Sequence, residues 1–102
     1  MHVIAARSIR EFADAHVDAR RPLMEWLYTV ERAQWASIDE LRTVYPHADA
    51  VKVKSGKDVF VFNIKGGRYR LIAAIHFNRQ KVYTLRFLTH AEYDKDAWKG
   101  QL

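Results

Sequence analysis

The stretch LRFLTHAEYD (residues 85–94) contains a histidine, a glutamate, a tyrosine and an aspartate within five positions, directly after a strand-like run. His90 and Tyr93 are side chains that can carry protons to and from a reacting group. Thr89 and Glu92 also form the threonine-x-x-glutamate pattern of a helix capping box. The pattern predicts that Thr89 and Glu92 start a last short helix and that His90 and Tyr93 are free for chemistry.

With Thr89 at the N-cap, His90 is the first residue of that helix, and Tyr93 and Asp94 follow it by three and four positions on the same face. A helix N-terminus favours anions because its N–H groups are free and its dipole end is positive. His90 and Tyr93 are therefore candidates for a site that handles a phosphate. Asp94 is better explained as an orienting partner of an arginine or a histidine than as a catalyst.

The remaining histidines do not extend this cluster into a metal site. They show no spacing typical of metal ligands, and the chain has no cysteine. We therefore expect no metal and no cofactor. The lack of disulfides is typical of a reducing compartment. No signal peptide is evident, and no run approaches the roughly 18 apolar residues of a membrane span, so we expect a cytoplasmic protein without a membrane partner.

Positive charge is concentrated in the second half of the chain. Residues 1–50 carry six Lys/Arg and eight Asp/Glu, whereas residues 51–102 carry eleven and four, so the halves have net charges of about −2 and +7. A basic half suggests a polyanionic partner, most often nucleic acid. The simpler alternative is that the charge only keeps a small protein soluble.

The first half of the chain has helical periodicity. HVIAA (residues 2–6) can form a short strand, and capping-box patterns at residues 8–11 and 37–40 each predict a helix start. Between them an apolar stripe with i, i+3, i+4, i+7 spacing predicts a helix, whose first turn can hold Pro22. The stripe consists of Leu23, Trp26, Leu27 and Val30. Pro46 ends the third helix.

The second half has the pattern of strands. VKVK, DVFVFNI, RYRLIAAIHF and KVYTLRFLT predict four antiparallel strands, with Gly66-Gly67 as a hairpin turn and NRQ (residues 78–80) as a loop. We expect one α+β domain spanning residues 1–102. In it the N-terminal strand and two to three helices pack on one face of an antiparallel sheet, and a short helix ends the chain.

The two loops predict a register. A turn at Gly66-Gly67 places Lys65 opposite Arg68 and Asn63 opposite Arg70. A three-residue NRQ loop places Ile75 opposite Tyr83, Ala73 opposite Leu85 and Leu71 opposite Phe87, unless a bulge shifts the local pairing. The face under the helices then collects Phe60, Phe62, Ile64, Tyr69, Leu71 and Ala73. The other face collects Asn63, Lys65, Arg68, Arg70, His76 and Arg86.

This second face is basic, with no acidic residue between Lys65 and Glu92. The planar fork of arginine suits phosphates. A face that served only solvation would usually mix charges of both signs. The pattern therefore favours an anion-binding surface over a merely solvated strand face.

FNIKGGRYRLIAAIHFNRQKVYTLRFLTHAEYDK (residues 62–95) resembles the HigB toxins, RelE-like mRNA-cleaving partners of type II toxin–antitoxin systems. The resemblance rests on FNI before a glycine turn, YRLIA on the next strand and THAEYDK at the end. It implies a RelE-like fold with RNA on the face away from the helices. It also implies metal-independent, ribosome-dependent cleavage of mRNA, ribosomal RNA contacts, and a cognate HigA-type helix-turn-helix antitoxin.

The resemblance also implies site residues. Arg70 lies in the YRLI motif, His90 and Tyr93 lie in THAEYD, Lys65 lies in FNIKG, and Arg86 stands where the family tends to carry a basic residue. These five form the expected catalytic set, in which His90 or Tyr93 transfers protons and the three cations stabilise charge. Tyr93 would need cationic neighbours to act as a base, or could stack on a nucleobase instead. The expected RNA-backbone contacts are Lys52, Lys54, Lys57, Arg68, Lys81 and Lys95.

Two other functions fit the same basic face. A non-catalytic RNA-binding module needs no proton-transfer group, and an interaction protein would use the positive surface for an acidic protein partner. The grouping of His90, Tyr93 and Arg70 favours catalysis. The tail with Trp98, Lys99 and Leu102 could close over the site or contact the antitoxin.

Overall fold

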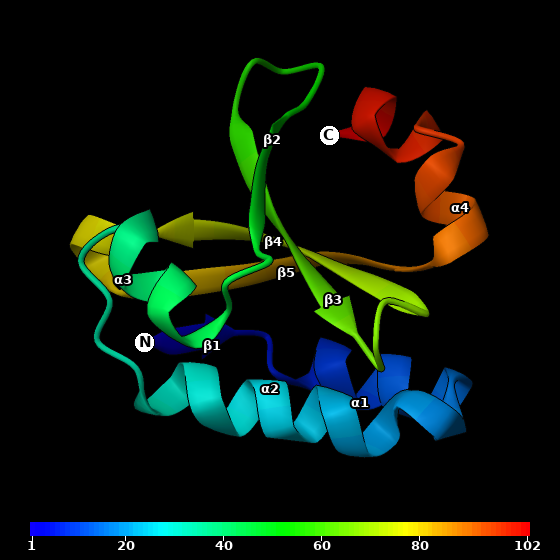
Figure 1. Ribbon diagram of the computed structural model, residues 1–102, viewed down its shortest axis with the longest axis horizontal. Coiled ribbons are helices and arrows are strands. Elements are labelled where there is room, and N and C mark those ends of the chain that lie inside the picture. The colour runs from blue at the N-terminus through cyan, green and yellow to red at the C-terminus, as the bar shows by residue number, and fades with distance from the viewer.

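A helical layer and a five-stranded sheet make up the computed structural model, which describes residues 1–102 (Figure 1). The elements in chain order are β1 (His2–Ile4), α1 (Arg7–Ala15), η1 (Val17–Ala19), α2 (Arg20–Arg32), α3 (Ile38–Val44), β2 (Asp49–Lys52), β3 (Asp58–Ile64), β4 (Tyr69–His76), η2 (Phe77–Arg79), β5 (Lys81–Thr89), α4 (His90–Asp94) and η3 (Ala97–Gln101). The expected α+β class is confirmed. None of the helices is long and apolar enough to cross a membrane.

The strand order in the sheet is β1-β5-β4-β3-β2. The four strands of the second half pair as antiparallel neighbours, as expected. β1 adds to the edge of β5 in parallel, with Val3 opposite Val82, so the sheet is mixed rather than purely antiparallel. The predicted first strand is therefore confirmed, and its position at the edge is a finding of the structure.

The helical layer covers one face of the sheet, where α1 and α2 lie along β5, β4 and β3 (Figure 1). The predicted stripe of α2 is buried, with Leu23 fully buried and Trp26 2% exposed. The Trp26 ring meets the Phe62 ring edge-on at 5.4 Å. Six of the apolar residues predicted to face the helices, Phe60, Phe62, Ile64, Tyr69, Leu71 and Ala73, belong to this core. Leu85, predicted opposite Ala73 on the same face, instead packs against apolar residues on the other face of the sheet. Burial of the helix-covered apolar face is the main driving force that joins the two layers.

The predicted start of α3 at Ser37 is confirmed, but two of the three predicted capping boxes need correction. α1 begins at Arg7 after Ala6, whose αR backbone makes no side-chain cap, so Ser8 and Glu11 form no capping box. At α3, the Ser37 hydroxyl accepts the Glu40 N–H at 3.4 Å, but the Glu40 carboxylate accepts from Ala36 at 2.6 Å, which leaves the reciprocal half of the box unmade.

The third helix start, at α4, has a complete capping box. The Thr89 hydroxyl accepts the Glu92 N–H at 3.2 Å, and the Glu92 carboxylate accepts the Thr89 N–H at 2.9 Å. These two bonds hold the pKa of Glu92 below its ordinary value, since they favour the charged carboxylate. The structural role predicted for both residues is confirmed.

The first predicted hairpin register is confirmed, with Asn63 opposite Arg70 and Ile64 opposite Tyr69. The Arg68 N–H donates to the Lys65 carbonyl at 3.2 Å and closes the turn. Because the register holds, the side chains of Asn63 and Arg70 lie on the face away from α1 and α2.

The second predicted register holds only over half of its length. Leu71 lies opposite Phe87 as expected, but a bulge between Ile72 and Ala73 shifts the remainder by one residue. Ala73 therefore pairs with Thr84 rather than Leu85, and Ile75 pairs with Val82 rather than Tyr83. The cause is the loop, which has four residues (77–80) and ends with Gln80 in the left-handed region at φ 55°. Leu85 is the extra residue that the bulge absorbs.

The face opposite the helices carries a second, smaller apolar cluster. Its members are Val53, Val59, Val61, Ile72 and Trp98. Trp98 lies in η3 and is only 3% exposed, and the Lys54 N–H donates to the Lys99 carbonyl at 3.0 Å. The C-terminal segment thus packs against the sheet and the β2–β3 hairpin (Figure 1), and the basic surface is confined to the remaining part of this face.

Leu71 tests how much stability the helix-facing core contributes. It is fully buried, so Leu71→Ala should lower the free energy of unfolding by roughly 2–5 kcal/mol through lost apolar burial and a residual cavity. Val44→Ala is the control, since Val44 is about half exposed and should cost less than about 1 kcal/mol. Urea unfolding measures both. Equal losses would contradict the assigned core.

Candidate active site

A shallow groove lies on the sheet face away from α1 and α2, between β2, the β3–β4 hairpin and α4. Its volume is about 380 Å³, and its lining is mostly polar. The lining residues are Pro46, His47, Asp49, Val61, Asn63, Arg70 and Tyr93. We call it the Arg70 groove. It combines a cation, a carboxylate, an imidazole, an amide and a phenol, which are the group types needed to bind an anion and move protons.

Arg70 lies half-buried in the groove and is held from two sides. Its guanidinium donates to the carbonyl oxygens of Gly67 and Tyr69. The guanidinium carbon also lies 5.4 Å from the centre of the Tyr93 ring, within the range of a cation–π contact. Arg70 and Tyr93, which the sequence analysis grouped together, are thus in contact in the structure.

Tyr93 is fixed by Trp98. The two rings stack with centres 5.4 Å apart and planes 20° apart, and the Trp98 indole N–H donates to the Tyr93 carbonyl at 3.1 Å. Burial raises the pKa of the Tyr93 phenol, and the opposing effects of Lys99 and Arg70 do not reverse this. The phenol therefore keeps its proton at neutral pH. This property suits a hydrogen-bond or proton donor and not a base.

His90 is not brought into the groove. It starts α4, as predicted, but its Nδ1 lies 2.8 Å from the Asp94 carboxylate, and both side chains are more than half exposed. The partnership expected of Asp94 with a histidine or an arginine is confirmed. Among the lining residues of the groove, Tyr93 is the one contributed by α4.

Arg86 shares the face of Arg70 but lies outside the groove. Arg86 belongs to β5, where it pairs with Ile72 of β4. It is half-buried, and its guanidinium donates to the Leu85 carbonyl at 2.7 Å. Because it follows the bulge at Leu85, its position depends on that irregularity.

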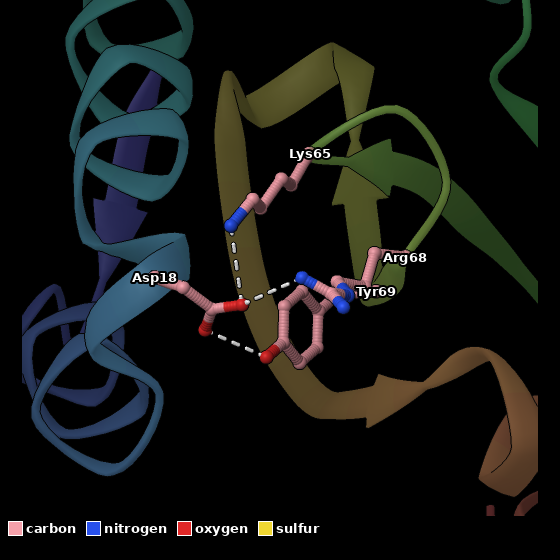
Figure 2. A network of polar contacts seen from close by, with 4 residues as sticks. All are labelled: Asp18, Lys65, Arg68 and Tyr69. Atoms are coloured by element: carbon pink, nitrogen blue, oxygen red, sulfur yellow. Dashed lines mark hydrogen bonds and ion pairs between the residues drawn. The ribbon is translucent and has the colours of Figure 1, made fainter.

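Lys65 and Arg68 are placed differently from the sequence-based expectation. Figure 2 shows both turning toward Asp18 of η1, in the helical layer. The Asp18 carboxylate accepts from Lys65 Nζ at 3.2 Å, from Arg68 Nη1 at 3.4 Å and from the Tyr69 hydroxyl at 2.7 Å. The two cations therefore lie at the hairpin end beside a carboxylate and not on an acid-free face. The sequence argument was wrong here because it counted only acidic residues between positions 65 and 92.

The other predicted RNA contacts occupy three separate places. Lys52, Lys54 and Lys57 are exposed on the β2–β3 hairpin, where Lys52 pairs with Asp58 at 3.4 Å. Lys95 is exposed directly after α4. Lys81 is half-buried at the start of β5, next to His2 of β1 and at the other end of β4 from Arg70. The hairpin lysines and Lys95 thus lie on or directly after elements that also contribute to the groove, β2 and α4, whereas Lys81 is at the other end of β4 from Arg70.

Two groove residues, His47 and Asp49, were missed from the sequence. They follow Pro46, for which the sequence predicted only the end of the third helix. Their place beside Arg70 and Tyr93 depends on tertiary structure, so no local pattern indicated it. The structure brings no three His, Asp or Glu side chains together in a geometry that could hold a metal ion.

Known proteins resemble this chain over nearly its full length. A sequence model of the HigB toxin family, described as the RelE-like toxic component of a toxin-antitoxin system, matches residues 19–96. The mRNA interferase toxin HigB of Escherichia coli strain K12 is 28% identical over 94 residues, which cover 92% of this chain and 88% of that protein. The mRNA interferase HigB of Shigella flexneri shows the same identity and coverage. The mRNA interferase HigB of E. coli O6:H1 strain CFT073 is 26% identical over 95 residues, or 93% and 90% of the two chains.

Gly67 tests how the hairpin turn holds Arg70. It has a φ of 90°, and a Cβ at this position would lie 3.3 Å from Arg70 Nη1. Gly67→Ala should therefore lower the free energy of unfolding by more than the roughly 1–2 kcal/mol that a left-handed alanine costs. Gly66→Ala is the matched control, because its φ is 63° and its Cβ would meet open space. Urea unfolding that gave equal losses would contradict the contact with Arg70.

The Asp18 network should make stability depend on pH. The bond from Tyr69, supported by Lys65 and Arg68, lowers the pKa of Asp18 below its ordinary value. A lowered folded-state pKa stabilises the protein above the unfolded pKa of about 3.9, and this contribution is lost as the pH falls through the folded value. Asp18→Asn should thus be less stable than the parent near pH 7, with a difference that shrinks below about pH 4.

Thermal unfolding at several pH values measures this difference. Glu31→Gln is the control, since it changes an exposed carboxylate of α2 and should alter the free energy of unfolding by less than about 0.5 kcal/mol. An Asp18→Asn difference that stayed constant from pH 7 to pH 3 would refute the network.

Proposed function

Because this chain belongs to the HigB toxin family, the RelE-like toxic components of toxin–antitoxin systems, we propose that it is an endoribonuclease that cleaves mRNA and so inhibits translation and growth. Its relatives in E. coli and S. flexneri are mRNA interferases by name. The resemblance expected from the FNI, YRLIA and THAEYDK motifs is confirmed by the family match. The cleavage is proposed to occur on ribosome-bound mRNA, with contacts to ribosomal RNA.

An antitoxin partner follows from membership in a family of toxin components. We propose that this partner is a HigA-type helix-turn-helix protein. Finding a neighbouring reading frame for such a protein, and growth rescue when both are produced, would support this partner. Production of the chain with an unrelated helix-turn-helix protein is the control.

The side chains of the protein are sufficient for the proposed cleavage. RNA can be cut by its own 2′-hydroxyl, whose oxygen bonds to the adjacent phosphorus while the bond to the 5′-oxygen breaks. The upstream fragment then ends in a 2′,3′-cyclic phosphate and the downstream fragment in a 5′-hydroxyl. The protein must accept the 2′-hydroxyl proton, stabilise the anionic phosphorane, and return a proton to the 5′-oxygen.

The observation that carries the proposal is the joining of Arg70 and Tyr93 in the groove. Arg70 supplies a planar, always charged donor set for the phosphorane oxygens. Tyr93 retains its proton and can donate it to the leaving 5′-oxygen, or stack on a nucleobase. Both side chains are held in place before substrate arrives, by Gly67 and by Trp98.

The other cations are proposed to bind the RNA around the cleaved bond. Arg86 lies on the same sheet face and would hold a phosphate next to the groove. Lys65 and Arg68 already share the Asp18 carboxylate, so we assign them to neighbouring backbone phosphates rather than to the phosphorane. The exposed Lys52, Lys54, Lys57 and Lys95 would contact mRNA or ribosomal RNA, and such contacts weaken with salt. Lys81 is the weakest candidate because of its remote position.

A non-catalytic RNA-binding module remains the rival function. It explains the basic hairpin equally well, but it gives no reason for a proton-donating tyrosine beside a fixed arginine. The enzyme and the binding module can be distinguished by the mRNA ends that cleavage leaves. Only the enzyme generates new mRNA ends with a 5′-hydroxyl, which accept a phosphate from polynucleotide kinase.

Arg70 tests the proposal directly. Production of the parent chain in cells should yield new mRNA 5′ ends by primer extension, and Arg70→Ala should reduce their rate of formation by about 100- to 1,000-fold through the loss of a charge-stabilising donor. Arg79→Ala is the matched control, since it removes an exposed arginine in η2 at the far end of β4. Cleavage of purified ribosome-bound mRNA, but not of free mRNA, would support the ribosome dependence.

Two results would count against the proposal. Intact mRNA in cells whose growth the parent chain stops would refute the reaction. Parental cleavage by folded Arg70→Ala would show that the Arg70 groove is not the site.

A further inference from the structure

The Arg70 groove contains a proton donor but, among the residues predicted from the sequence, no proton acceptor. Tyr93 keeps its proton at neutral pH, since the pKa of a tyrosine is ordinarily about 10 and burial raises that of Tyr93 further. His90, the predicted alternative, lies outside the groove and is paired with Asp94. A cleavage that starts from a neutral 2′-hydroxyl needs an acceptor within hydrogen-bond reach of that oxygen.

We propose that His47 is this acceptor, a catalytic residue that takes the 2′-hydroxyl proton in the Arg70 groove. This inference rests on the proposed function and adds a residue to it. His47 lines the groove together with Arg70, Tyr93 and Asn63. It approaches from the segment between α3 and β2, so the phosphate site has Tyr93 on α4, Arg70 on β4 and His47 on a third element.

The turn that carries His47 is anchored on both sides. Ala48 is 3% exposed, its N–H donates to the Tyr45 carbonyl at 3.1 Å, and its carbonyl accepts from Arg42 Nε at 3.1 Å. The Tyr45 ring packs edge-on against Phe62 with centres 5.3 Å apart. The backbone on either side of His47 is therefore fixed, while His47 itself is an exposed residue that lines the groove. A fixed backbone with an accessible side chain is what a preorganised acid–base group requires.

The choice of His47 over Asp49 follows from acidity. A general base works best when the pKa of its residue type lies near the operating pH, which is about 6.5 for histidine and about 3.9 for aspartate. Asp49, on β2, is a second negative charge near a phosphate and so opposes substrate binding. A carboxylate beside an imidazolium, however, stabilises the charge that proton transfer creates.

The proton balance closes within the groove. His47 takes the 2′-hydroxyl proton as the 2′-oxygen bonds to phosphorus, and the 5′-oxygen leaves with the Tyr93 proton. Arg70 stabilises the intervening phosphorane. After release of the products, the His47 imidazolium gives up its proton to solvent and the Tyr93 phenolate takes one from it, which restores the starting state. No oxidant, metal or further reactant takes part.

The charged and titratable groups around His47 set the expected pH dependence. Asp49 of β2, Arg70 of β4 and Tyr93 of α4 share the groove with it. On its other side Tyr45 lines a small hollow with His47, and Arg42 of α3 binds the adjacent Ala48 carbonyl. Among these five, none is a side-chain type that ordinarily titrates between about pH 5.5 and 8.5.

The test is single-turnover cleavage of mRNA bound to purified ribosomes, followed from about pH 5.5 to 8.5. The parent rate should rise with pH and then level off as one group loses a proton. His47→Gln should lower the plateau by about 100- to 10,000-fold and abolish this rise. Ribosome binding of the variant, measured by co-sedimentation, should match that of the parent, because the glutamine removes only the titrating group.

Two further variants sharpen the outcome. His76→Gln is the matched control, since it changes another exposed histidine at the far end of β4 that lines a different hollow, and it should retain the parental rate and profile. Asp49→Asn should retain the pH-dependent rise even if its plateau changes. Circular dichroism and thermal unfolding confirm that each variant is folded.

The failures are distinguishable. If the parent cleaves mRNA and folded His47→Gln cleaves at a similar rate with the same profile, the role of His47 is overturned and the proposed function stands. Loss of ribosome binding by His47→Gln, with the pH-dependent rise retained, would overturn it as well. If the parent itself leaves mRNA intact, the proposed function fails and the assignment of His47 fails with it.

Discussion

The pairing of Asn63 with Arg70 across β3 and β4 is the constraint on which the rest of the structure depends. Side chains alternate across a strand, so this one register sends Phe62 and Leu71 into the helix-covered core and Arg70 to the opposite face. A slip of one residue would expose the apolar side chains and bury a guanidinium without a partner, at a large desolvation cost. The site therefore exists because the core excludes the alternative register.

The rigidity of the site comes from contacts that lie outside it. On one side Asp18 links the helical layer to the hairpin through Tyr69, Lys65 and Arg68, and so holds the turn from which Arg70 extends. On the other side Trp98 belongs to the small apolar cluster on the same sheet face as the groove, and its ring stacks on the ring of Tyr93. Neither Asp18 nor Trp98 lines the groove, yet both determine the separation of the arginine from the tyrosine.

The sequence correctly predicted the features that depend on the periodic spacing of apolar residues and on local hydrogen bonds. The buried stripe of α2, the Asn63–Arg70 register and the capping box of α4 all follow from neighbours within a few positions. Two of the failures depend on residues that are distant in the sequence, and the other two depend on backbone conformations that no residue pattern indicated. The bulge at Leu85 depends on a left-handed residue in the preceding loop, the partner of Lys65 comes from a helical turn 47 positions away, and His47 reaches the groove only through tertiary packing. The capping box predicted at Ser8 does not form because the residue before α1, Ala6, already has helical backbone angles, so the helix starts without a side-chain cap.

The parallel pairing of β1 with β5 has a consequence for synthesis. Val3 finds its partner Val82 only after 79 further residues have been added, which takes roughly 4–16 s at ordinary translation speeds. Until then the nascent chain has an unpaired leading strand, and Tyr93, which completes the groove, is made later still. An incomplete chain released before these residues thus lacks both the closed sheet edge and the Arg70–Tyr93 pair. The closed sheet edge and the Arg70 groove can therefore both be present only after Tyr93 has been added to the chain.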